Sequence, residues 1–193
     1  MNDSSKNVSL LYRRIQTKED LHIYIERDAK ANKMDCSYFK YLISLYYGLE
    51  RAHAFRYLKC LRKYEYYSNN KGFYCRVMSL YYKVKHSRLS MKYNLHIPKN
   101  TCGYGLKILH VFGGGQIINV ERVGNYCCFN AGCVLGKNNT NAKPVLGDNV
   151  TMAPGSMAFG EIVIGNNVFI APNTIVTKDI PDNSTVVGVN RII

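Results

Sequence analysis

One histidine of the 193-residue chain stands beside an unusual backbone feature. His110 follows the strand-like run 106–109 and precedes three consecutive glycines at 113–115. Such a run of glycines indicates a sharp turn, or the close approach of another group to the backbone. An imidazole at this point could bond the carbonyls of the turn. It could equally act as a general base, because its ordinary pKa of about 6.5 lets it accept a proton near neutral pH.

The other histidines of the N-terminal half give weaker signals. His22, His53 and His86 lie in helix-like stretches without a partner at metal-ligand spacing. We therefore expect surface or packing roles for them, and no metal site.

The seven cysteines are odd in number and include no C-x-x-C pair. This pattern argues against a disulfide framework or a zinc site and favours reduced thiols in a cytoplasm. Cys127, Cys128 and Cys133 could form an acyl-cysteine intermediate. They could also be small side chains that pack inside a repeat.

A six-residue repeat fills much of the C-terminal half and must position these groups. Between Leu146 and Pro181 the first position of every block is apolar and the second is mostly small. A period of six fits neither an α-helix nor a sheet meander. It fits a coil of short parallel strands in which each side points one aliphatic side chain inward. The repeat therefore predicts a parallel β-helix.

The same phase continues upstream at Val123, Phe129 and Leu135 and then slips before Leu146. The extra residues fall in the polar, turn-rich segment 137–144, which we expect to leave the coil as a loop. Loops on a rigid scaffold are frequent places for binding sites.

The two halves of the chain differ in composition. Residues 1–93 contain 19 Lys and Arg against 8 Asp and Glu, and 14 of the 16 tyrosines, whereas residues 94–193 contain 7 basic against 5 acidic residues. The basic half has no nucleic-acid-binding motif, so we expect a solvated basic face and no nucleic-acid partner. Contact with an anionic membrane surface stays open.

Helical patterns occupy the first half. Thr17 with the acids that follow it predicts a helix start, and Asp35 or Ser37 could cap a second helix. Further helices are expected at about 51–66 and 73–90, separated by the polar break 69–72. The chain is thus divided into an α-helical domain, 1–93, and a coil domain, 94–193. It contains no signal-peptide pattern and no membrane-spanning stretch, which predicts a cytoplasmic protein.

Several segments together resemble the left-handed β-helix acyltransferases. They are the hexapeptide ladder, the Ile-Leu-His110-x-x-Gly-Gly element, the Lys143–Val150 segment and the closing stretch 176–193. The nearest branch contains the serine acetyltransferases and the related polysaccharide O-acetyltransferases. The resemblance implies a mainly β fold, a left-handed parallel β-helix preceded by a small α-helical domain. It also implies a homotrimer with active sites in clefts between neighbouring coils.

The resemblance assigns roles to individual residues. Acetyl-CoA would be the acetyl donor, and His110 would be the general base that deprotonates an acceptor hydroxyl. Asn130 stands where the polysaccharide branch has a second histidine, and it could donate to the oxyanion or orient the acceptor. The positions expected to bind the cofactor are Ala153, Ser156, Ala171, Thr174, Lys178 and Arg191.

The departures from the family concern the acceptor. An acid that holds the serine ammonium is replaced by Leu109, and the Arg-His pair for the serine carboxylate by Ala142 and Lys143. Because buried charge without partners is costly, free serine is expected to be a poor acceptor. A neutral sugar needs no partner for an ammonium or a carboxylate. Lys143 and Asn119 are the expected acceptor contacts.

The acid that pairs with the catalytic histidine in the family is replaced by Leu95. What orients His110 is therefore open, and the candidates within the coil are His96, Asn119, Glu121 and Asn130.

These observations lead to one expectation and two alternatives. We expect an acetyl-CoA-dependent O-acetyltransferase that modifies a hydroxyl on a saccharide or its precursor. The first alternative is serine O-acetylation for cysteine synthesis. The second is a trimeric β-helix scaffold without catalysis, suggested by Leu95 in place of the partner acid.

Overall fold

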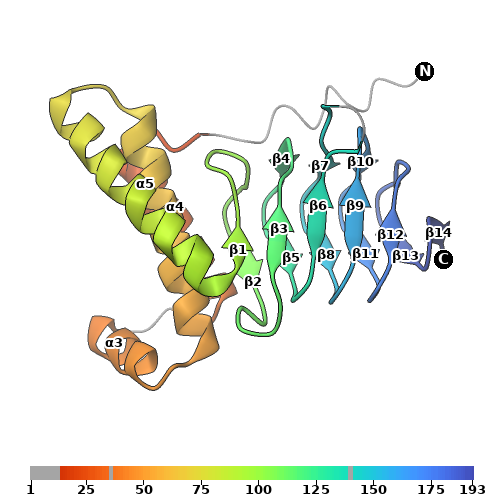
Figure 1. Ribbon diagram of the computed structural model, residues 1–193, viewed down its shortest axis with the longest axis horizontal. Coiled ribbons are helices and arrows are strands. Elements are labelled where there is room, and N and C mark those ends of the chain that lie inside the picture. The colour runs from red at the N-terminus through yellow and green to blue at the C-terminus, as the bar shows by residue number, and fades with distance from the viewer. Residues whose placement is uncertain (1–13, 35–36, 139–140) are drawn as a thin grey trace.

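The structure, a computed structural model, describes residues 14–34, 37–138 and 141–193. Four helices come first in these ranges: α2 (Lys18–Ala31), α3 (Tyr38–Tyr46), α4 (Glu50–Asn69) and α5 (Phe73–Tyr93). They gather at one end of the molecule, and the strands extend away from them as a stack of coils (Figure 1). Within the described ranges, every helix is too short or too polar to cross a membrane.

The helix boundaries follow local capping. Thr17 Oγ1 accepts a hydrogen bond from the Asp20 N–H at 3.0 Å, and Asp20 Oδ2 accepts one from the Thr17 N–H at 3.0 Å. This capping box confirms the predicted start of α2. Ser37 caps α3, and the alternative cap, Asp35, lies outside the described residues. Helices α4 and α5 include the predicted segments 51–66 and 73–90 and continue slightly beyond them.

Short strands make up the rest of the described chain. They are β1 (Leu95–His96), β2 (Lys107–Ile108), β3 (Gln116–Ile118), β4 (Arg122–Val123), β5 (Cys128–Phe129), β6 (Val134–Gly136), β7 (Val145–Leu146), β8 (Thr151–Met152), β9 (Met157–Phe159), β10 (Val163–Ile164), β11 (Phe169–Ile170), β12 (Ile175–Val176), β13 (Thr185–Val187) and β14 (Arg191–Ile192). They form three sheets, ordered β1-β3-β6-β9-β12, β10-β7-β4 and β14-β13-β11-β8-β5-β2. All named pairs are parallel except β13 with β14, so the predicted parallel β-helix is confirmed.

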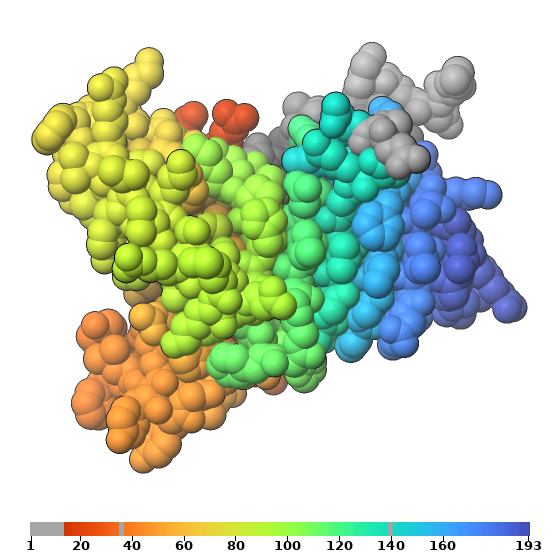
Figure 2. Space-filling model, in the orientation of Figure 1, coloured from red at the N-terminus to blue at the C-terminus, as the bar shows by residue number. Residues whose placement is uncertain are grey.

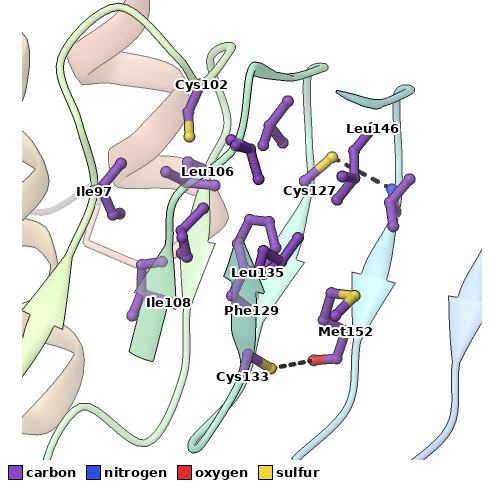
Figure 3. Close-up of a cluster of buried hydrophobic side chains, with 14 of the residues drawn as sticks. Ile97, Cys102, Leu106, Ile108, Cys127, Phe129, Cys133, Leu135, Leu146 and Met152 are labelled. Atoms are coloured by element: carbon purple, nitrogen blue, oxygen red, sulfur yellow. Dashed lines mark hydrogen bonds between the residues drawn. The ribbon is translucent and has the colours of Figure 1, made fainter. Parts of the chain in front are cut away.

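The hexapeptide phase is confirmed by burial. The first residues of the six blocks, Leu146, Met152, Ala158, Ile164, Ile170 and Val176, are all fully buried. They stack in register, for example Phe129 on Met152 and Met152 on Ile170. Figure 3 shows part of this interior, where Phe129, Leu146 and Met152 lie together with Cys127 and Cys133. Each coil therefore covers the apolar edge of the next, which is what a solenoid requires.

The coil corners explain the small and polar positions of the repeat. A Cβ on Gly147 would lie 2.6 Å from Asn166 Oδ1 on the next coil, so only glycine fits there. Asn149, Asn167 and Asn183 occupy one corner with positive φ angles, which asparagine tolerates better than most residues. Their side-chain amides bond to one another along the stack at 3.0 and 2.9 Å.

A buried ion cluster fastens the helices to the first coil. The Arg62 guanidinium bonds to Asp28 Oδ2 at 2.8 Å and to Glu65 Oε2 at 3.1 Å, and all three side chains are inaccessible to solvent. It also donates to the carbonyls of Cys102 and Gly103 at 2.9 and 2.6 Å. The helical core continues without a break into the core of the coil. The orientation of the helices relative to the coil is thus fixed by directional contacts.

The predicted loop is present. The described part of 137–144 lies between β6 and β7 and contains no strand, and Lys137 Nζ donates to Asn141 Oδ1 at 3.1 Å. The insertion leaves the ladder intact, because Val123, Leu146 and Ile164 still stack on one another.

Candidate functional site

His110 lies in the turn that follows β2 on the first coil. Its backbone has a φ of 57°, in the left-handed region that few side-chain-bearing residues adopt, and its carbonyl accepts a hydrogen bond from the Gly113 N–H at 3.0 Å. Its side chain is 60% exposed. Among the described residues, the imidazole makes no hydrogen bond to the carbonyls of the turn. The ring is therefore accessible for chemistry and is not used to brace the backbone.

A carboxylate from the helices faces this imidazole. Glu50 is the first residue of α4, and its Oε2 lies 3.8 Å from His110 Nδ1. The other oxygen, Oε1, is buried and accepts no hydrogen bond from the described residues. A buried acceptor without a donor is costly, and such atoms are often completed by a ligand or a water. The pair joins an accessible base to an acid with unused hydrogen-bonding capacity.

The turn that carries His110 is held from both sides. Gln116 Nε2 donates to the Leu109 carbonyl at 2.8 Å, directly before the histidine. A Cβ on Gly115 would lie 2.5 Å from Asn94 Nδ2, so the glycine allows the segment to pass against the end of α5. The tight packing predicted from the three glycines is confirmed at this position.

The aromatic ring of Phe112 packs the same turn against the helices. The Phe112 ring lies 5.3 Å from the His53 ring and 6.1 Å from the Tyr93 ring, both in edge arrangements. His53 Nδ1 is 2.9 Å from the Tyr93 hydroxyl. Burial, with Lys92 and Arg56 nearby, lowers the pKa of His53. A neutral imidazole can pair with the tyrosine hydroxyl, which confirms the packing role predicted for His53.

The structure separates the sequence-based candidates for orienting His110. Of the described acidic residues, Glu50 is the one within ion-pair distance of the ring. His96 lies near His86, whose pKa it helps to lower. Leu95, in the place of the family's partner acid, is buried in the core. The acid that lies nearest the ring therefore comes from a helix, whereas the candidates expected from the sequence all lie in the coil.

Asn119 and Asn130 both lie on the coil that follows, which contains β3, β4 and β5. Asn130 comes directly after β5, which pairs with the strand leading to His110, and its Nδ2 donates to the Met152 carbonyl at 2.9 Å. One amide hydrogen is thus committed to the scaffold, and the second stays available. Asn119 follows β3 and is half-buried, with its backbone N–H bonded to the Leu135 carbonyl at 3.0 Å.

The small corner residues lie on the later coils. Ser156 and Thr174 are buried, Ala153 is nearly so, and Ala171 is half-buried. The Ser156 hydroxyl donates to the Ala153 carbonyl at 2.7 Å, and Thr174 Oγ1 has no partner in the described residues. The backbone N–H groups of all four donate within the coil. These residues can supply close-fitting corners and carbonyl oxygens, but no free N–H donors within one chain.

The basic candidates lie far along the coil from His110. Lys178 and Arg191 are exposed near the C-terminal end, and neither forms an ion pair with a described residue. Segment 109–115 and the described part of segment 137–144, which carries Lys143, lie at opposite edges of the coil stack (Figures 1 and 2). A site that used both segments would need two chains.

The cysteines of the coil are poor nucleophiles. Burial raises the pKa values of Cys127, Cys128 and Cys133, so little thiolate is present near neutral pH. Cys127 and Cys133 point into the core in Figure 3, where Cys133 Sγ donates to the Met152 carbonyl at 3.5 Å. The packing interpretation of these residues is supported. Within the described ranges, no group of three or more metal-ligating side chains comes together.

Glu50 is the residue that sequence reasoning missed. It is the first acid of an ordinary amphipathic helix, far from His110 in the chain, and nothing in its neighbours distinguishes it from a helix-starting acid. Only the docking of α4 on the first coil brings it to the histidine.

Comparison with known proteins gives consistent results. No protein-family model matches the chain. It is 30% identical over 176 residues to the serine acetyltransferase of Bacillus subtilis, and the match covers 89% of this chain and 73% of that protein. It is 36% identical over 107 residues to the serine acetyltransferase of Synechococcus elongatus, covering 53% of this chain but only 43% of the relative.

The solved structures support the same fold. The Neisseria gonorrhoeae serine acetyltransferase in complex with serine matches with a TM-score of 0.63 and 22% identity, over 91% of this chain and 70% of that one. A serine acetyltransferase in complex with CoA matches with a TM-score of 0.62 and 15% identity, over 91% and 70% of the two chains. At these identities the likeness concerns the fold alone.

Proposed function

The chain belongs to the serine acetyltransferase family, and we propose that it transfers an acetyl group from acetyl-CoA to the hydroxyl of serine. The observation that carries this proposal is the His110–Glu50 pair at the start of the coil, an accessible base beside an acid with a free oxygen. The family and the acceptor named for its relatives support serine over the saccharide that the sequence analysis ranked first.

The proposed reaction uses His110 as the general base. Its imidazole accepts the hydroxyl proton as the hydroxyl oxygen attacks the thioester carbonyl, and the tetrahedral intermediate then expels the CoA thiolate, which takes the proton back. Glu50 stabilises the imidazolium that forms in between, because opposite charges attract across the short Nδ1–Oε2 separation. The second amide hydrogen of Asn130 is proposed to donate to the oxyanion.

Glu50 also removes the main objection to a serine acceptor. With Leu109 in place of an acid, the sequence offered no partner for the serine ammonium. Glu50 Oε1 is a buried acceptor without a donor in the described residues, and an ammonium would satisfy it. Lys143 is proposed to meet the serine carboxylate, with Asn119 as a neutral contact.

The proposed assembly is a homotrimer with its sites between chains. One face of the coil exposes a ladder that is mostly apolar: His96, Ile117, Val134, Met157 and Ile175, paired in register. Ile117 is 47% exposed in the single chain, and Ile175 is 38% exposed. A contiguous apolar ladder favours burial against another subunit. Side-by-side packing would also bring segment 137–144 of one chain toward segment 109–115 of the next.

The proposed donor site runs along such a cleft. The small corners Ala153, Ser156, Ala171 and Thr174 would line it, and Lys178 and Arg191 would pair with the phosphates of CoA. One solved structural neighbour is a serine acetyltransferase in complex with CoA, which supports this donor.

A saccharide hydroxyl is the second candidate acceptor, because Leu109 and Ala142 are uncharged where the serine-binding members carry charge. Both acceptors are tested by one assay, in which the protein is incubated with acetyl-CoA and either L-serine or simple sugars, and free CoA thiol is followed. Turnover on serine that is lost in His110→Ala supports the proposal. Turnover on sugars alone would favour the second candidate, and no thiol release with any acceptor would favour a scaffold.

A further inference from the structure

A basic cavity lies between helices α3, α4 and α5, and its described lining residues do not include His110 or Glu50. It has a volume of about 180 Å³, well above the roughly 10–15 Å³ that one water needs. Its lining comprises four cations, three tyrosines and one cysteine: Arg56, Lys59, Lys63, Lys85, Tyr38, Tyr41, Tyr82 and Cys60. The three helices occupy the end of the molecule opposite the C-terminal coils (Figure 2).

The four cations are not neutralised by the protein. All are half-buried, none forms an ion pair with a described residue, and no acid is among the described lining residues. The ammonium groups rest on aromatic rings instead: Lys63 Nζ lies 5.6 Å from the centre of the Tyr82 ring and Lys59 Nζ 5.7 Å from that of Tyr41. Ring faces hold these two lysines in place but leave their N–H groups free to donate. The Arg56 side chain also makes a hydrogen bond to Tyr93.

Holding like charges together in this cavity is unfavourable. Burial, together with the neighbouring Lys63, lowers the pKa of Lys59. Bringing four half-buried cations together without counter-charges costs free energy, part of which a bound anion would return. A single carboxylate would balance one of the four charges, whereas a phosphate brings two charges and several acceptor oxygens.

We propose that this cavity binds a phosphate group that carries two negative charges, either on a small soluble molecule or on a lipid headgroup. The arginine provides planar paired donors and the lysines point charges, the combination that suits phosphate oxygens. The lipid source has support of its own. The outer face of α3 beside Tyr38 is apolar and aromatic, with Phe39 71% and Tyr46 88% exposed, and α3 has no acid. Such a face suits a membrane interface.

The test uses pyrophosphate as the probe and isothermal titration calorimetry as the measurement. Saturating CoA is included, so that phosphate contacts of the proposed donor site do not contribute. The double variant Lys59→Gln/Lys85→Gln removes two lining cations. Its matched control, Arg51→Gln/Lys83→Gln, removes two exposed cations from the same two helices. We expect the dissociation constant to rise about tenfold or more in the first variant and less than about twofold in the control.

Two results would overturn the proposal: no binding of pyrophosphate by the unaltered protein, or an equal weakening in both double variants, which would indicate general electrostatic attraction. Both variants should retain acetyl transfer, so failure here is distinct from failure of the proposed enzyme activity.

A second measurement separates the two sources of phosphate. Sedimentation with phosphatidylcholine vesicles is compared with and without phosphatidic acid. Binding that requires phosphatidic acid, is competed by pyrophosphate and is lost in Lys59→Gln/Lys85→Gln identifies a lipid headgroup. Pyrophosphate binding without vesicle binding identifies a soluble phosphate.

Discussion

Glu50 Oε2 lies 3.8 Å from His110 Nδ1, although the acid begins a helix and the histidine lies in the turn after a strand of the coil. The contact joins the two halves of the chain at the place where the chemistry is proposed. The helical half therefore contributes a side chain, the Glu50 carboxylate, to the proposed site as well as supporting the coil. The consequences of this contact, and those of the packing around it, can be measured.

Replacing Glu50 with Gln should lower turnover about tenfold, because a neutral amide cannot stabilise the imidazolium. Steady-state kinetics with acetyl-CoA and serine check this. A fall in kcat alone indicates a role toward His110, and a rise in KM for serine indicates a role toward the ammonium. Glu121→Gln is the matched control, since that acid is exposed and has no contact with the ring. Unchanged kinetics in Glu50→Gln would contradict the proposed pair.

Replacing Arg62 with Ala should lower the free energy of unfolding by about 3–5 kcal/mol, because it leaves Asp28 and Glu65 buried without their counter-charge. Urea denaturation monitored by circular dichroism measures the loss. Arg76→Ala, an exposed arginine of α5, should change stability by less than about 0.5 kcal/mol. Equal effects in the two variants would mean that the ion cluster does not fasten the helices.

Introducing charge into the exposed apolar ladder should dissociate the proposed trimer. The double variant Ile117→Asp/Met157→Asp places two carboxylates where the partner subunit would pack. Sedimentation velocity should report a smaller species with normal circular dichroism. The matched variant Thr151→Asp/Thr185→Asp alters another face of the coil and should leave assembly unchanged. A trimer that survives the first change packs through a different face.

Removing the exposed cations Lys178 and Arg191 should raise the KM for acetyl-CoA about five- to tenfold, with little change in the KM for serine. The reason is that each substitution, Lys178→Ala and Arg191→Ala, would remove a charge-assisted hydrogen bond to a CoA phosphate. Lys99→Ala, an exposed lysine at the helical end of the coil, serves as control. If the two variants raised the KM for serine and left the KM for acetyl-CoA unchanged, acetyl-CoA would have to bind elsewhere.

His86 should make stability depend on pH. Burial, with His96 nearby, lowers its pKa from 6.5 to about 4, and its Nε2 has no partner in the described residues. Between these two values the unfolded chain binds a proton that the folded chain does not. The folded state therefore loses up to about 3 kcal/mol as the pH falls from 6.5 to 4.

The variant His86→Phe isolates this contribution. The ring sits against Tyr57 at 4.9 Å, a site that phenylalanine can fill. The difference in unfolding free energy between the variant and the unaltered protein should change across this pH range, since the other titrating groups cancel. A difference that stays constant with pH would disprove the assignment.

Much of the fold could be predicted because the repeat is local. A period of six places Leu146, Met152 and Ile164 on the inside whatever the rest of the chain does, and the start of α2 follows from Thr17 and Asp20 alone. The glycines at 113–115 indicated the turn of His110, because glycine allows a sharp turn or the close approach of another group where a Cβ would clash. The acceptor was harder to predict. Leu109 and Ala142 lack the charges of the family pattern, and their positions in the chain do not indicate that an acid from another element, Glu50, lies nearby.

The sequence by itself determined the coil, its inward ladder and the histidine at its first turn, because these depend on residues within one or two repeats. The tertiary structure alone decided that Glu50 faces His110, that four cations surround one cavity, and that segment 109–115 and the described part of 137–144 lie at opposite edges of the coil. Each of these depends on how a helix docks or how many coils separate two residues. Docking is set by the shape of the packed core and by the buried bonds of Arg62, which leave no periodic trace in the chain.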